Sequence, residues 1–127
     1  MPDTTPSEAQ IAALVHAFYD KVREDAALGP IFNAAIADWG PHLDKMCAFW
    51  SSVMCMSGRY HGNPMAAHIR LKSVQPEHFT RWLELFGETA REICPPQMAR
   101  SFEAKAQTIA RSLQMGMFWR PAAQASA

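Results

Sequence analysis

The sequence predicts a single all-α domain that spans residues 1–127, with flexible ends at about residues 1–4 and 120–127. Apolar residues recur three and four positions apart in several long stretches, which is typical of amphipathic helices. Prolines and glycines separate these stretches, and no stretch alternates with period two for long enough to form a strand. A hydrophobic content of 49% in 127 residues is ample for one packed core.

The first helix is expected to begin after the flexible end and to stop near Asp25. Thr5 is the expected N-cap, Pro6 suits the first helical position, and Glu8 completes a capping box. The apolar stripe of this helix consists of Ile11, Leu14, Val15, Phe18 and Val22. Tyr19 lies at the flank of that stripe, about 100° from its neighbour.

A break at Leu28-Gly29-Pro30 should end the first helix, after which Ile31-Phe32 returns to the core and residues 33–36 form a helical turn. The next helix opens at Asp38-Trp39-Gly40-Pro41, stops at Ser57-Gly58 and has two apolar faces. One face contains Leu43, Cys47, Trp50 and Met54, and the other contains His42, Met46, Phe49 and Val53. A helix that is apolar on both faces is buried on both, so the second face could meet something other than protein.

Three more helices complete the expected fold. Asn63 can cap a short helix that has Pro64 at its first position and carries His68. A longer helix starts at Pro76, stops at Pro95-Pro96 and has the stripe Phe79, Trp82, Leu83, Phe86, Ala90 and Ile93. The last helix covers residues 97–118 and turns Met98, Phe102, Ala106, Ile109 and Leu113 inward.

Composition narrows the functional class. The 12 basic and 12 acidic residues give zero formal charge, which argues against nucleic-acid binding. There is no signal-peptide pattern and no apolar run of the roughly 20 residues that a membrane span needs. Three widely spaced cysteines without a Cys-x-x-Cys pair predict reduced, mostly buried thiols in a cytoplasmic protein. The pattern does not favour a disulfide framework, a zinc site or covalently attached haem.

The histidines are the strongest chemical signal, because glycine-rich phosphate loops, nucleophile elbows and His-Glu-x-x-His motifs are all absent. His68 lies on a short helix beside a loop whose carbonyls could accept from one ring nitrogen, as a metal-ligating imidazole requires. His42 could face the other side of a flat ring, with Tyr19 and Trp82 as hydrogen-bond donors. The ordinary structural alternatives are that His68 is a hydrogen-bonded core histidine, that Tyr19 is half-buried with its hydroxyl at the surface, and that Trp82 belongs to the core.

Four segments together resemble the truncated haemoglobins of group III. They are Phe18–Arg23 with Leu28–Asn33, Trp39–His42 leading to Phe49-Trp50, Tyr60–Pro64 leading to His68, and Phe79–Phe86. The resemblance extends from about Ile11 to Met117, and the lack of a Gly-Gly pair favours group III over groups I and II. It implies a shortened globin in which a two-over-two helical sandwich encloses haem b.

The resemblance also implies residue roles. His68 would be the proximal iron ligand, and Tyr19, His42 and Trp82 would lie on the ligand side. The residues implied around the ring are Phe32, Met46, Phe49, Trp50, Tyr60, Leu71 and Phe79. The candidate partners of the haem carboxylates are Arg59, Tyr60 and Arg70.

Reversible binding of O₂, CO and NO, as in oxygen binding or transport, is the primary expectation for function. The alternative is haem redox chemistry on NO, nitrite or peroxide, which would need a separate reductase because the chain has no flavin or nicotinamide domain. A remote alternative is a cofactor-free helical interaction module. Neither nucleic acid nor membrane is an expected partner, and the chain is expected to be a monomer or a weak homodimer.

Overall fold

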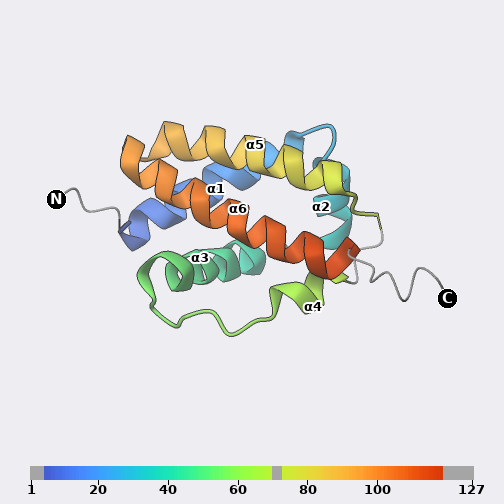
Figure 1. Ribbon diagram of the computed structural model, residues 1–127, viewed down its shortest axis with the longest axis horizontal. Helices are drawn as coiled ribbons and strands as arrows, with labels where there is room; N and C mark the ends of the chain where they lie inside the picture. Colours follow the sequence, from blue (N-terminus) through green and yellow to red (C-terminus); the bar gives the residue numbers. More distant parts are fainter. Residues whose placement is uncertain (1–4, 70–72, 119–127) are drawn as a thin grey trace.

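The computed structural model describes residues 5–69 and 73–118, and these residues form six α-helices and no strand. The helices are α1 (Glu8–Glu24), α2 (Gly29–Ala35), α3 (Trp39–Cys55), α4 (Pro64–Ile69), α5 (Pro76–Ile93) and α6 (Pro96–Phe118). α5 and α6 lie side by side, α1 packs against both α3 and α5, and α4 packs against α6 (Figure 1). The predicted all-α, two-over-two arrangement is confirmed.

The start of α1 differs from the prediction. Ser7, not Thr5, is the N-cap: its hydroxyl accepts from the backbone N–H of Gln10 at 3.1 Å, and its own N–H donates to the Gln10 side chain at 2.8 Å. Glu8 does not complete a capping box, because its carboxylate accepts from Ser51 on α3 and pairs with Arg59. The end of α1 near Asp25 is confirmed.

The other helix boundaries follow their signals more closely. The exception is α2. Gly29 and Pro30 were expected only to break the chain, but they begin this helix, which is longer than the expected turn at 33–36. Asp38 caps α3 by accepting from the N–H of Gly40 at 3.3 Å. α3 stops at Cys55, where Met56 adopts a left-handed conformation with φ 56°. α5 and α6 begin at Pro76 and Pro96, within one residue of the expected starts.

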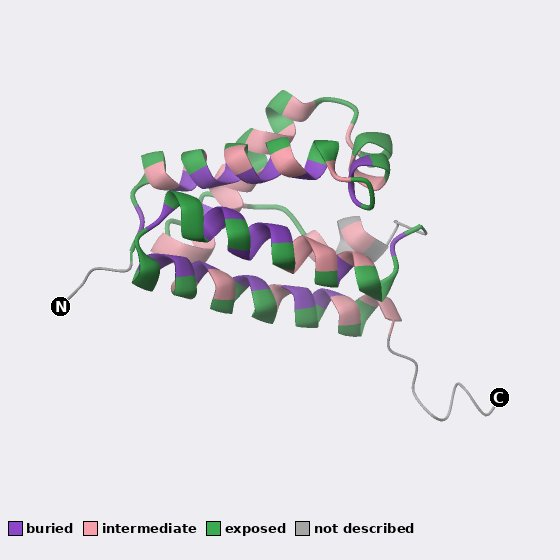
Figure 2. Cartoon of the chain, turned by 90° about the horizontal axis from the view of Figure 1, so that it is seen from above, coloured by how far each residue is buried: buried purple, intermediate pink, exposed green. Residues whose placement is uncertain are grey.

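An aromatic cluster forms the centre of the main core. The Phe86 ring stacks on Trp50 and on Trp82, with centroid separations of 4.9 and 5.3 Å, and meets Phe18 edge to face at 5.2 Å. Buried residues recur along the long helices, between exposed ones (Figure 2). Ile93 is an exception to the predicted stripe of α5, because 37% of its surface is exposed.

Two polar connections fix the ends of the helices relative to one another. Asp25 accepts from the N–H groups of Ala27 and Leu28 and from the guanidinium of Arg81 on α5, at 2.8–3.1 Å. Ser51, which is fully buried, donates to Glu8 and shares a hydrogen bond with Ser57, both at 2.7 Å. The first connection joins the α1–α2 turn to α5, and the second joins the α3–α4 loop to α1.

The cysteines are free, as expected, but only Cys94 is buried, whereas Cys47 and Cys55 are half-buried. Within residues 5–69 and 73–118, none of the helices has the length and apolar character that crossing a membrane would require.

Candidate functional site

A cavity of about 330 Å³ lies between the helices, within the size range of small-molecule sites. All six described helices contribute to its wall, together with loop residues on either side of α4. The lining residues are Tyr19, Leu28, Ile31, Phe32, Ala35, His42, Lys45, Met46, Phe49, Trp50, Tyr60, Gly62, Asn63, Pro64, His68, Val74, His78, Phe79, Trp82, Ile109, Ala110 and Leu113. The wall is mostly apolar, so its few polar groups determine its chemistry.

His68 presents the right tautomer for binding a metal. It lies on α4, and its Nδ1 is 2.7 Å from the carbonyl oxygen of Pro64 in the first turn of that helix. Because a carbonyl oxygen can only accept, Nδ1 carries the proton and donates it. In the neutral ring this leaves the lone pair on Nε2, which is the form in which a histidine binds iron.

His42 is the first residue of α3 that lines the cavity. Its Nε2 atom is buried and has no hydrogen-bond partner among the described residues. Burial lowers the pKa of His42, and the positive charge of nearby Lys45 lowers it further. His42 is therefore neutral at pH 7, with one ring nitrogen available to a group in the cavity.

Tyr19 is only 6% exposed, so it is not a half-buried tyrosine with its hydroxyl at the surface. Burial raises the pKa of its phenol, so the side chain keeps its proton and remains a donor. The Tyr19 ring contacts Phe32, Trp39 and His42, with centroid distances of 6.0, 5.7 and 5.4 Å. Helices α1, α2 and α3 thus meet around this one hydroxyl-bearing ring.

Trp82 reaches the same cavity from α5. Its indole is nearly parallel to the Phe86 ring, at an interplanar angle of 6°, and meets Phe18 edge to face at 5.4 Å. These contacts fix the plane of the indole, which is half-buried. The cavity therefore brings together Tyr19, His42 and Trp82, which lie far apart in the sequence.

The remaining predicted residues fall into three groups. Phe32, Met46, Phe49, Trp50, Tyr60 and Phe79 all line the cavity. Leu71 and Arg70 lie outside the described residues. Arg59 does not line the cavity, because its guanidinium pairs with Glu8 instead.

Some lining residues were not predicted from the sequence. His78, to which no role was assigned from the sequence, accepts from the Gln75 N–H at 2.8 Å at the start of α5 and also borders the cavity. Lys45 was assigned no role, although it lies one helical turn after His42. Ile109 and Leu113 were predicted to be ordinary core residues of α6, and nothing in their spacing distinguishes a core from a cavity wall.

These features fit a haem. A porphyrin supplies four equatorial ligands, so the protein needs to add only one or two axial ones, usually histidine. The cavity offers the Nε2 of His68, whose Nδ1 is engaged by Pro64, and the unpartnered Nε2 of His42, within walls that suit a flat apolar ring.

Comparisons with known proteins agree with this chemistry. Residues 3–115 match the family of bacterial-like globins. A group 3 truncated haemoglobin of Campylobacter jejuni is 37% identical over 114 residues, which cover 87% of this chain and 90% of that protein. A crystal structure of a group III truncated haemoglobin from Campylobacter jejuni matches with a TM-score of 0.86 at 35% identity, covering 93% of this chain and 96% of that one. The chain therefore belongs to the bacterial-like globins, and within them to the haem-binding truncated haemoglobins of group III.

Proposed function

We propose that this globin reversibly binds O₂ and other diatomic gases at a haem b whose proximal ligand is His68. Haem supplies an iron with an axial position at which such gases bind. The observation that carries the proposal is the 2.7 Å hydrogen bond from His68 Nδ1 to the Pro64 carbonyl, because it orients the ring and leaves Nε2 as the ligating atom.

Tyr19 and Trp82 are the proposed donors to the gas ligand. Both line the cavity, both are fixed by aromatic contacts, and the raised pKa of Tyr19 keeps its O–H intact. A hydrogen bond from either side chain would stabilise the ligand by about 0.5–1.5 kcal/mol net, because the cavity wall is mostly apolar. Loss of one donor should then speed ligand release about twofold to tenfold.

His42 is proposed as a ligand-side gate or as a second axial ligand. Its lowered pKa keeps the ring neutral, so either ring nitrogen could accept or donate according to the tautomer. Visible spectra of the ferric and ferrous forms distinguish these two roles, since ligation by His42 would give a six-coordinate iron before any gas is added.

The proximal assignment is tested by replacing the histidines one at a time. His68→Gly should abolish the normal five-coordinate ferrous spectrum, and added imidazole should restore it by occupying the space that the side chain leaves. His61→Gly is the matched control, because His61 is exposed and does not line the cavity. A normal ferrous spectrum in His68→Gly without imidazole would show that another residue binds the iron.

Redox chemistry on NO, nitrite or peroxide is the competing use of the same cavity. The cluster of Tyr19, His42 and Trp82 favours it as a second candidate, because donors that stabilise a diatomic ligand can also polarise the bond between its atoms. Mixing the oxygenated protein with NO, followed by turnover with an added reductase, separates the two functions. Repeated turnover at a rate that exceeds ligand release would favour the redox function, and a single slow reaction would favour gas binding.

A further inference from the structure

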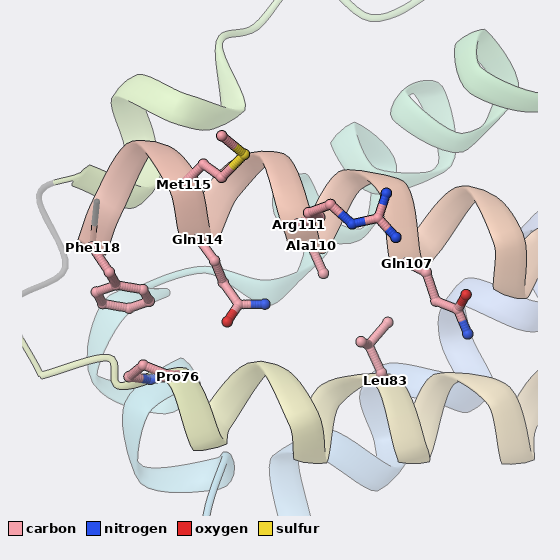
Figure 3. Close-up of a pocket in the computed structure, with 8 residues that line it drawn as sticks. All are labelled: Pro76, Leu83, Gln107, Ala110, Arg111, Gln114, Met115 and Phe118. Carbon is pink, nitrogen blue, oxygen red and sulfur yellow. The ribbon is translucent and has the colours of Figure 1, made fainter. Parts of the chain in front are cut away.

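A second hollow, more open to solvent than the haem cavity, lies between α5 and α6 on the outside of the molecule. Its volume is about 620 Å³, and we call it the α5–α6 cleft. It is lined by Pro76, Leu83, Gln107, Ala110, Arg111, Gln114, Met115 and Phe118 (Figure 3). It shares only Ala110 with the haem cavity and contains none of the residues to which a haem role has been assigned.

The polar lining of the α5–α6 cleft comes from one stripe of α6. Gln107, Arg111 and Gln114 follow one another at helical spacing, and Phe118 continues the stripe. Figure 3 shows both glutamine side chains extending from α6 toward α5, with Arg111 between them along the helix. Arg111 is exposed and has neither an ion pair nor a hydrogen bond within the described part of the chain.

The apolar lining lies beside this stripe. Leu83 extends from α5 toward α6, Ala110 is only 2% exposed, and Phe118 and Pro76 lie at one end (Figure 3). Met115, 61% exposed, borders the cleft from α6, but its side chain extends away from α5 (Figure 3).

The length of the cleft suits an extended chain rather than a compact ion. From Gln107 to Phe118 the helix rises about 16 Å, at roughly 1.5 Å per residue. One end therefore offers the guanidinium of Arg111 with Gln107 and Leu83 beside it, and the other end offers the proline and aromatic surface of Pro76 and Phe118, with Gln114 between the two ends (Figure 3). A guanidinium binds a planar carboxylate through two parallel hydrogen bonds, and the amide N–H groups of glutamine can add to them.

We propose that the α5–α6 cleft is a binding site for an amphipathic monocarboxylate, such as a medium-chain fatty acid. The carboxylate pairs with Arg111 between Gln107 and Gln114, and the hydrocarbon chain lies over Leu83 and Ala110 toward Phe118. Arg111 is the only charged side chain among the described residues of the lining, so the site selects an anion over a cation. This site does not depend on how the haem cavity is used.

Calorimetric titration of the haem-loaded protein with decanoate, below its micelle concentration, tests the proposal. The loaded protein is used so that the apolar haem cavity cannot take up the acid. Saturable binding of decanoate is expected, and each methylene removed from the chain should weaken it about fourfold, since about 0.8 kcal/mol is lost per buried methylene. Absence of saturable binding would overturn the proposal.

Two variants and one uncharged probe locate the head group. Arg111→Gln should weaken decanoate binding about twofold to fivefold, as for an exposed ion pair, and leave decanol binding unchanged. Arg100→Gln is the matched control: Arg100 is exposed on the same helix but does not line the cleft, so both affinities should stay the same. Equal decanoate affinities in the wild type and in Arg111→Gln would refute the proposed head-group contact.

Methyl NMR locates the hydrocarbon chain. Decanoate should shift the methyl resonances of Ala110 and Leu83, and Leu83→Gln should weaken decanoate and decanol binding alike. Shifts confined to residues of the haem cavity, such as Ile31 and Met46, would place the acid there and overturn the assignment to the α5–α6 cleft.

Discussion

The ring of Tyr19 on α1 meets the ring of His42 on α3 edge to face, with 5.4 Å between centroids and an interplanar angle of 85°. Trp39 completes the group, with centroids 5.7 Å from Tyr19 and 5.6 Å from His42. Each ring limits the rotation of the other two, so the phenol O–H and the imidazole nitrogens hold fixed positions in the cavity wall. This rigidity makes single-atom substitutions at the site interpretable.

Tyr19→Phe removes one oxygen atom and keeps the ring that packs against His42 and Phe32. Release of O₂ from the haem-loaded protein should become about twofold to tenfold faster, because one donor worth about 0.5–1.5 kcal/mol is lost. Stopped-flow measurement of O₂ dissociation gives the ratio, and an unchanged rate would exclude Tyr19 as a donor.

Thr89→Val is the control for this substitution, because Thr89 also has a buried hydroxyl, which donates to the carbonyl of Leu85 at 2.7 Å, but it does not line the cavity. Its O₂ release rate should match that of the wild type. Equal acceleration in both variants would point to a general loosening of the cavity and not to a specific hydrogen bond.

Asp25→Asn should lower the free energy of unfolding at pH 7 by about 1 kcal/mol, because the hydrogen bonds from Arg81, Ala27 and Leu28 lose their charged acceptor. The hydrogen bond from Arg81 is the main reason that the pKa of Asp25 lies below its usual 3.8. A depressed carboxyl pKa means that the unfolded chain takes up the proton first. The stabilisation is therefore complete above about pH 5 and is lost as the pH falls through 3.8 toward the pKa of the folded state.

Urea unfolding at a series of pH values measures this dependence. The wild type should lose more stability than Asp25→Asn between pH 5 and the acid transition, so the two curves should converge at low pH. Asp20→Asn serves as the control, because Asp20 is exposed on α1 and should give a curve parallel to that of the wild type. Curves for Asp25→Asn that stay parallel to the wild type would contradict the prediction.

Ser51→Ala should destabilise the fold by about 1 kcal/mol, although the change removes only one oxygen atom. The Ser51 hydroxyl is fully buried and joins the carboxylate of Glu8 to the hydroxyl of Ser57. The melting temperature should drop by about 3–5 °C for a domain of this size. Ser112→Ala, an exposed change on α6, should leave it unaltered, and equal melting temperatures for Ser51→Ala and the wild type would rule out a stabilising role.

Gly29→Ala should cost about 1–3 kcal/mol, because a Cβ atom there would lie 2.8 Å from the backbone oxygen of Arg23. Backbone atoms cannot rotate away as a side chain can, so α2 would have to move away from the end of α1. Gly40→Ala is the matched control, since the nearest atom to its new Cβ would be Asp38 Oδ1 at 3.7 Å. Chemical denaturation of the two variants gives the comparison, and similar stabilities would refute the close approach at Gly29.

The start of α1 shows why sequence alone can misplace a cap. Both Thr5 with Glu8 and Ser7 with Gln10 have capping-box spacing, so local rules do not choose between them. Tertiary structure decides, because Ser51 and Arg59 engage the Glu8 carboxylate and Ser7 forms the box with Gln10. Prolines and Asp38 placed the starts of α3, α4, α5 and α6 to within a residue or two, whereas α2 begins at Gly29, four residues before the expected turn.

Much of the cavity lining was predictable because its polar residues lie on otherwise apolar helix faces. His42 and Met46 belong to the spare face of α3, and that face does line the cavity. Val74 and Leu113 could not be predicted to line it, since a wall and a core have the same composition and only three-dimensional packing separates them. His78 was missed because its capping role gave a sufficient local reason for its presence.

All six described helices contribute residues to the cavity wall, so the local stability of the helices depends on what fills the cavity. At one end, the interior is a core of buried protein side chains, which includes Phe18, Phe86 and Phe102. At the other end, a small second cluster, which includes Val74 and Phe79, borders the cavity. A prosthetic group bound in the cavity would therefore stabilise that end of the molecule. Slow amide hydrogen exchange there should require the cofactor, whereas slow exchange around Phe86 should not.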